Sequence, residues 1–77
     1  MLIYRFVSEK AWGFDVRKDA SNLAQQPGLW TPAQLGPINT EMMSDNDWQR
    51  AGVDKLALMN DIEVKGCHIC PKPDWAL

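Results

Sequence analysis

The residues best suited to chemistry lie near the end of the chain, where Cys67 and Cys70 enclose His68. Two cysteines separated by two residues have the spacing of half a tetrahedral zinc site, because both sulfurs can reach one metal ion from a tight turn. The chain has no other cysteine and no second histidine, so a set of four ligands requires a second copy of the chain. A zinc-bridged homodimer through Cys67 and Cys70 is therefore one interpretation, and the sequence indicates no other cofactor.

A thiol redox protein is a second interpretation of the same cysteines. A reactive cysteine commonly lies at the N-terminus of a helix, whose backbone N–H groups lower the pKa of the thiol. Here Pro71 and Pro73 follow Cys70 closely and only seven residues remain, so such a helix has no room. The ordinary interpretation is that both cysteines are small apolar side chains near the end of a strand.

Other catalytic arrangements are not indicated. His68 needs a partner group and a substrate pocket to act as a general base, and the sequence identifies neither. The serines lack the glycine context of a nucleophile elbow, and no glycine-rich phosphate-binding loop is present. We therefore expect no enzymatic activity.

The four tryptophans form a second group of candidate functional residues. They are more aromatic bulk than a domain of this size needs, and tryptophan is enriched in protein interfaces. Spacing predicts that Trp12 and Trp48 belong to the core. Trp75, beyond the last predicted strand, is the best candidate for contact with another protein, unless it seals its own core. Trp30 is the other candidate, and its alternative role is to cover the core.

Size and charge narrow the class of function. A chain of 77 residues forms one domain. The formal net charge of −2 gives no electrostatic reason to expect nucleic-acid binding. Residues 41–63 hold six acids against two bases, which either attracts a basic partner or forms a solvated helix face.

No apolar run is long enough to cross a membrane and no signal peptide is recognisable, so we expect a cytoplasmic protein with reduced cysteines.

These observations favour a small non-enzymatic module that binds another protein, comparable to the accessory and inhibitor chains of bacteria and phages. Neither nucleic acid nor a membrane is expected as a partner. A homodimer through the edge of a hairpin or through the tail remains an open alternative.

The opening of the chain, residues 1–17, predicts an antiparallel β-hairpin. Two runs of β-forming residues, LIYRFVS and WGFDVR, are separated by a short polar break. A three-residue loop between them places Phe6 opposite Phe14 on one face and Arg5 opposite Asp15 on the outer face. The weak point is the absence of glycine from the loop position that must become left-handed.

Residues 18–40 form an irregular connection rich in proline and glycine. A short helical turn is predicted from Thr31 to Gly36, with Pro32 at the first helical position. Leu29 and Leu35, together with Trp30, are expected to anchor this connection to the hairpin, because a long loop without anchors is uncommon in a compact domain.

The second half of the chain predicts a helix followed by a strand. Residues 44–60 are a helical region that begins near Ser44 with an approximate capping box and is broken or bent near Gly52, although 53–59 also fits a strand. The alternation in IEVKGCHI predicts a strand over 62–70 with a bulge at Gly66, and 71–77 form a tail.

Taken together, these elements predict an α+β fold in a single domain, residues 1–77. An N-terminal antiparallel hairpin and a C-terminal strand form a sheet of about three strands. One main helix and the loop rich in proline and glycine cover it.

Overall fold

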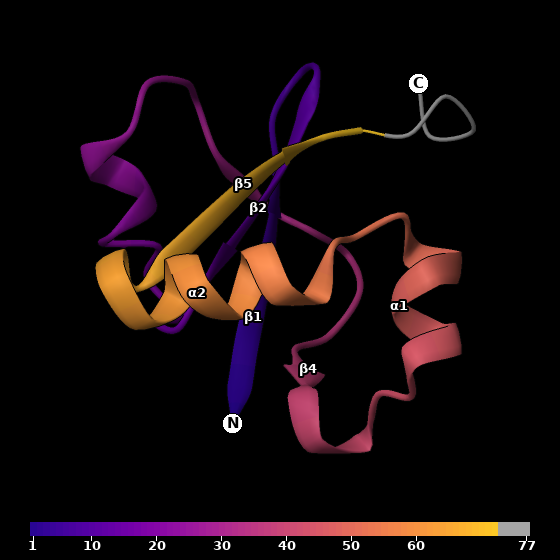
Figure 1. Ribbon diagram of the computed structural model, residues 1–77. Coiled ribbons are helices and arrows are strands. Elements are labelled where there is room, and N and C mark those ends of the chain that lie inside the picture. Colours follow the sequence, from indigo (N-terminus) through magenta and orange to yellow (C-terminus); the bar gives the residue numbers. More distant parts are fainter. Residues whose placement is uncertain (73–77) are drawn as a thin grey trace.

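An antiparallel sheet runs through the molecule, and the computed structural model describes residues 1–72 (Figure 1). The central hairpin is formed by β1 (Leu2–Val7) and β2 (Ala11–Asp15). β5 (Cys67–Pro71) pairs with the other side of β2. The short segments β3 (Thr31–Pro32) and β4 (Ile38–Asn39) both pair with β1. The predicted α+β class is confirmed, with a five-stranded sheet in place of about three strands.

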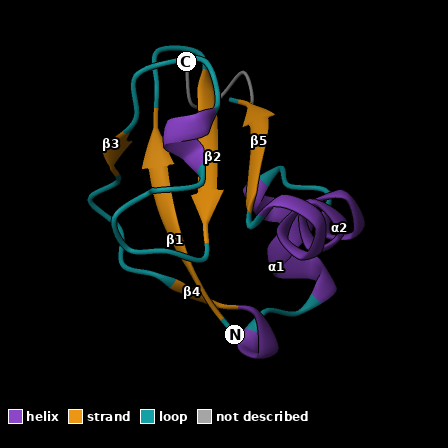
Figure 2. Ribbon diagram, turned by 90° about the vertical axis from the view of Figure 1, so that its left-hand side faces the viewer, coloured by secondary structure: helices purple, strands orange, loops and turns teal. Residues whose placement is uncertain are grey.

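Two α-helices and two 3-10 turns complete the described chain. The helices are α1 (Asp45–Ala51) and α2 (Lys55–Lys65), and the turns are η1 (Leu23–Gln25) and η2 (Thr40–Met42). Figure 1 shows the segment that carries η1 on one side of the strands and α1 on the other, and Figure 2 shows η1 in front of β2. Within residues 1–72, no helix has the length and apolar character needed to cross a membrane.

The predicted register of the hairpin is wrong by one residue. Phe6 lies opposite Gly13, and Arg5 lies opposite Phe14. The three-residue loop that we predicted requires a left-handed residue, but Ala20 is the one non-glycine residue with positive φ in the described chain. Instead, the backbone N–H of Ser8 donates to the Ala11 carbonyl and closes a loop of different length. Because side chains alternate along a strand, this slip puts Phe6 and Phe14 on opposite faces of the sheet.

The sheet consequently has a core on each face. On the helix side, Phe14 packs with buried residues of both helices; the full cluster is Ile3, Phe14, Ile38, Trp48, Val53, Leu58 and Ile62. On the loop side, Phe6 packs with Leu23 and Cys67, and Trp30 lies against them. The hairpin is therefore the shared middle layer of the molecule, as in sheets whose strands are apolar on both faces.

The helical region is confirmed as two helices separated at Gly52, which adopts a left-handed conformation with φ of 73°. Ser44 and Asp47 form both hydrogen bonds of a capping box at the start of α1. Asp54 caps α2 by accepting from the Ala57 N–H, so residues 55–59 are helix and not strand.

The strand predicted over 62–70 is wrong in its first part, because residues 62–65 form the last turn of α2. Leu58 and Ile62 are both buried and lie one helical turn apart, whereas Val64 is 73% exposed. Gly66 then ends the helix with φ of 76°, and its N–H donates to the Ile62 carbonyl. This glycine is a helix C-terminal residue and not a strand bulge.

The connection after β2 also differs from the prediction. Residues 31–32 form an edge strand on β1, so no helical turn begins at Thr31. Leu29 and Leu35 are 88% and 67% exposed and do not anchor the connection. Its anchors are the fully buried Leu23 and the half-buried Trp30.

Asp15 explains how this irregular segment is held on the sheet. Predicted for the outer face, it is completely buried and points toward the loop side. Its two carboxylate oxygens accept four hydrogen bonds of 2.9 Å, from the backbone N–H groups of Arg17, Asn22 and Leu23 and from the side chain of Asn22. The Asn22 amide also donates to the Gly66 carbonyl, so one buried carboxylate joins β2, the loop and the start of β5.

Candidate binding pocket

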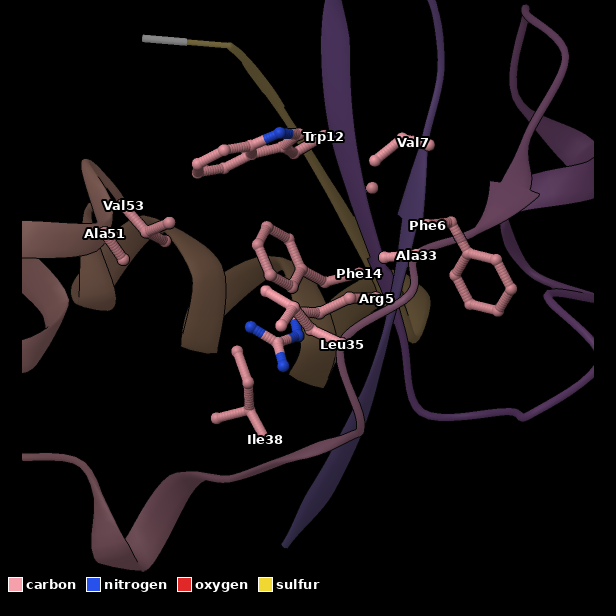
Figure 3. A pocket seen from close by; sticks show the side chains of 11 residues that line it. Arg5, Phe6, Val7, Trp12, Phe14, Ala33, Leu35, Ile38, Ala51 and Val53 are labelled. Atoms are coloured by element: carbon pink, nitrogen blue, oxygen red, sulfur yellow. The ribbon is translucent and has the colours of Figure 1, made fainter. Parts of the chain in front are cut away.

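An apolar pocket with a volume of about 330 Å³ lies on the helix side of the sheet. Residues 33–38 and the segment that connects α1 to α2 form its walls. Its principal side chains are Arg5, Trp12, Phe14, Leu35, Ile38 and Val53. Figure 3 shows Trp12 at one end of the pocket and the Arg5 guanidinium group at the other, while the Phe6 ring points away to the opposite side of the strands.

The register of the hairpin places these side chains together. Arg5 lies directly opposite Phe14, and Val7 lies opposite Trp12, so the four residues share one face of β1 and β2. Ala33 is fixed beside them because its backbone N–H donates to the Arg5 carbonyl. The pocket is thus built by a regular sheet and closed by segments that are distant in sequence.

Arg5 is the charged side chain of the pocket. Its Nε and Nη2 atoms both donate to the Gly36 carbonyl oxygen, at 3.0 Å for Nε. The ion pairs found within residues 1–72 join other groups, so none of these residues supplies Arg5 with a carboxylate. Partial burial lowers the pKa of Arg5 from its ordinary value, because burial disfavours the charged form.

Sequence reasoning missed this pocket. It assigned Arg5 to the outer face of the hairpin, opposite Asp15. The signal available in the sequence is that β1 is apolar at successive positions, at Leu2 and Ile3 and again at Phe6 and Val7, so both of its faces carry apolar side chains. Such a strand is typical of the middle layer of a domain, where a lone arginine is a conspicuous exception.

The structure separates the two cysteines that we considered as a metal half-site. Cys67 lies opposite Asp15 and Cys70 opposite Trp12, so their side chains project from opposite faces of β5. Along a strand, three residues also span about 10 Å. The Cys-x-x-Cys segment is thus an extended strand and not a tight turn, so the two sulfurs of one chain do not point toward a common metal position.

Both thiols are also poor candidates for a redox centre. Cys67 is 2% exposed, and burial, followed by the nearby negative charge of Asp15, raises the pKa of its thiol. Burial likewise raises the pKa of the half-buried Cys70. Neither thiol has the environment that stabilises a reactive thiolate.

His68 has a partner that the sequence did not identify. Its Nδ1 lies 2.7 Å from Oδ2 of Asp61, which joins β5 to α2 across the helix side of the sheet. The hydrogen bond from His68 is the main cause of a lowered pKa at Asp61. His68 is 7% exposed, packs near the Phe14 ring and does not line the apolar pocket. The pair therefore fastens α2 to β5 and lies outside the apolar pocket.

Of the two tryptophans predicted for partner binding, the structure describes Trp30. Trp30 lies over Gly13, where an added Cβ would come within 2.8 Å of its ring. This close packing agrees with the alternative role of Trp30, in which it covers the core on the loop side. Trp75 lies outside the described residues.

Comparisons of the chain with protein-family models, with curated protein sequences and with solved structures give no match. The functional interpretation therefore depends on the pocket and its chemistry.

Proposed function

We propose that the protein is a small non-enzymatic module that binds another protein by accepting an apolar side chain in the pocket beside Arg5. The observation that carries this proposal is the apolar pocket on the helix side of the sheet, about 330 Å³ in volume. This volume is near the lower limit of ligand pockets, about 300 to 1,000 Å³, and is suited to one or two side chains. Apolar anchors that fill pockets supply most of the free energy of many protein interfaces.

The alternatives receive less support from the described residues. An enzyme needs a reactive group that faces a cavity, whereas Cys67, Cys70 and His68 lie outside the pocket. The zinc-bridged dimer needs converging thiols, and the thiols leave opposite faces of β5. A second copy of the chain remains one partner that the pocket can accept, and sedimentation equilibrium distinguishes it from another protein.

The proposal places the protein in the cytoplasm, with protein and not nucleic acid or membrane as its partner. Two thiols that cannot reach each other within one chain are in keeping with a reducing compartment. A formal net charge of −2 gives no electrostatic reason to expect nucleic-acid binding.

The test uses peptides selected from a displayed library of random sequences and then synthesised. Their dissociation constants are measured for the wild-type chain, for Ala33→Phe, which fills the pocket, and for Gln34→Phe. The second variant adds the same ring at an exposed neighbour that does not line the pocket.

The proposal expects affinity to fall about tenfold or more in Ala33→Phe, the loss typical of an anchor that cannot enter its pocket. Gln34→Phe is expected to bind like the wild-type chain. Urea unfolding shows whether both variants are folded. Selection of no peptide, or equal binding by both variants, contradicts the proposal.

A further inference from the structure

Arg5 is the residue of the pocket that best indicates the chemistry of its ligand, because it supplies a positive charge among apolar side chains. A partly buried guanidinium group beside apolar side chains keeps only part of its contact with water, and an anion is the partner with which it forms its strongest hydrogen bonds. Figure 3 shows this group beside Phe14, Leu35 and Ile38. Within residues 1–72 its hydrogen-bond partner is the Gly36 carbonyl, which is polar but uncharged.

The hydrogen bonds from Arg5 to Gly36 use one side of the guanidinium group. A guanidinium group has five N–H donors. The Gly36 carbonyl occupies the side formed by Nε and Nη2. The end formed by Nη1 and Nη2 keeps the parallel N–H pair that binds the two oxygens of a carboxylate.

The apolar side chains of the pocket lie next to the Arg5 guanidinium group. Val7, Trp12 and Phe14 share a sheet face with Arg5, and Ile38 and Val53 close the other side. A ligand that satisfies both features has a carboxylate and a large apolar group a few ångströms apart. The last residue of a protein has this construction, because its side chain and its terminal carboxylate are attached to the same Cα atom. In an extended peptide, by contrast, an internal Asp or Glu points its carboxylate away from the side chain of the adjacent apolar residue.

We propose that the pocket recognises the free C-terminus of a partner protein whose last residue is large and apolar, with Arg5 bound to the terminal carboxylate. This inference depends on the proposed protein-binding function and adds the identity of the group that enters the pocket. The terminal side chain occupies the space between Trp12 and Ile38, and the carboxylate meets the Nη1 and Nη2 end of Arg5. Capture of a C-terminal carboxylate is a recurring mode of peptide recognition, most often by backbone N–H groups, and here the paired N–H donors of Arg5 would take that part.

The experiment measures binding of the peptide Gly-Ser-Gly-Ser-Phe by calorimetry and by ¹H–¹⁵N spectra that resolve the indole and guanidinium N–H groups. Three other ligands are compared with it. They are the same peptide with an amidated C-terminus, the free-acid peptide that ends in alanine, and 3-phenylpropionate, which carries the same two groups without a peptide chain.

We expect the free acid to bind about tenfold or more tightly than the amide, as when a hydrogen bond to a charged group is lost. The alanine-ended peptide is expected to bind about tenfold or more weakly, because it leaves the apolar walls empty. In Arg5→Gln the acid and the amide should bind equally, whereas Arg17→Gln, an exposed arginine outside the pocket, should keep the preference. Arg5→Lys retains the charge without the paired donors and should show an intermediate preference.

Several results would overturn the inference: equal affinity of the wild-type chain for acid and amide, spectral changes away from the pocket, or no binding at about millimolar peptide, where single-residue anchors become detectable. Tighter binding of 3-phenylpropionate than of the peptide would assign the pocket to small carboxylic acids. Peptides from the library that enter the pocket through internal side chains would leave the proposed function intact while the C-terminal specificity fails. Thermal unfolding of each variant separates loss of binding from loss of the fold.

Discussion

Replacement of Asp15 by asparagine tests whether one buried carboxylate holds the loop side of the molecule in place. Oδ1 accepts from the Arg17 N–H and the Asn22 side chain, and Oδ2 accepts from the Asn22 and Leu23 N–H groups. An asparagine retains one of these oxygens and presents an NH₂ group in place of the other. Two of the four donors then face another donor and lose their partner.

The expected cost follows from these contacts. A hydrogen bond to a charged group contributes about 1.5 to 3 kcal/mol, so two such losses amount to about 3 to 6 kcal/mol. The lower end applies here, because most of these donors are only partly buried and water can replace some bonds. A domain of this size has a free energy of unfolding of about 4 to 12 kcal/mol. Asp15→Asn is therefore expected to lose about 3 kcal/mol, a large share of the total.

Urea unfolding followed by far-ultraviolet circular dichroism measures this change, and thermal unfolding provides a second value. At about 4 to 8 °C for each kcal/mol, the midpoint temperature should fall by about 12 to 24 °C. The matched control is Asp19→Asn in the same loop, because Asp19 is exposed and accepts one backbone hydrogen bond, from Ser21. That variant should remain within about 0.5 kcal/mol of the wild-type chain. If Asp15→Asn lowers the free energy of unfolding by less than about 1 kcal/mol, and the slope of that free energy against urea concentration is unchanged, the role assigned to the carboxylate is refuted.

Two further predictions concern protonation and thiol reactivity. The pKa of Asp61 is lowered below its ordinary value of 3.8, chiefly by the hydrogen bond from His68. Ionised Asp61 therefore adds to the free energy of unfolding. This contribution is complete above pH 3.8 and is lost as the pH falls through the lower pKa of the folded state. The wild-type chain should therefore exceed Asp61→Asn in free energy of unfolding at about pH 5, and the difference should narrow at lower pH; a difference that stays constant down to about pH 2 would contradict this linkage. The buried Cys67, measured in the Cys70→Ser variant, should react with a disulfide reagent only when the protein unfolds. The half-buried Cys70, measured in the Cys67→Ser variant, should react in the folded protein. Equal rates for the two thiols in the folded chain would contradict this difference in burial.

Elements determined by neighbouring residues were predictable from the sequence. The cap at Ser44 and the break at Gly52 depend on local hydrogen bonds and on the conformational freedom of glycine, and both were confirmed. The α+β class followed from β-rich runs at the start of the chain and a helical pattern later.

Features that change when the strand pairing shifts by one residue were not predictable from the sequence. The hairpin slip depends on how residues 8–11 close the loop, and it exchanges the faces of every residue on one strand relative to the other. Residues 62–65 alternate between apolar and polar side chains as a strand does. They form helix because a helix buries both Leu58 and Ile62, which lie one turn apart on the same face. The same slip moved Arg5 from a supposed outer face into the pocket, so the candidate site was hidden by the error in register.

The pocket also required information that no local pattern contains. Its walls come from β1, β2, residues 33–38 and the connection between the helices, which lie far apart in the sequence. The two cysteines, in contrast, are close in sequence but are separated by the alternation of a strand. Short spacing therefore indicated a site that the fold does not assemble.

The two cores have the strands in common but consist of different side chains. The loop side is a segment with little regular structure, fastened by Asp15, whereas the helix side is built from two capped helices. Such layers open with different free energies, so the amide hydrogens of residues 18–30 should exchange with solvent through local opening events that leave the helices protected. Weakening of the Asp15 contacts should therefore raise exchange in the loop layer first, at a lower free energy than the global unfolding that exposes the helices.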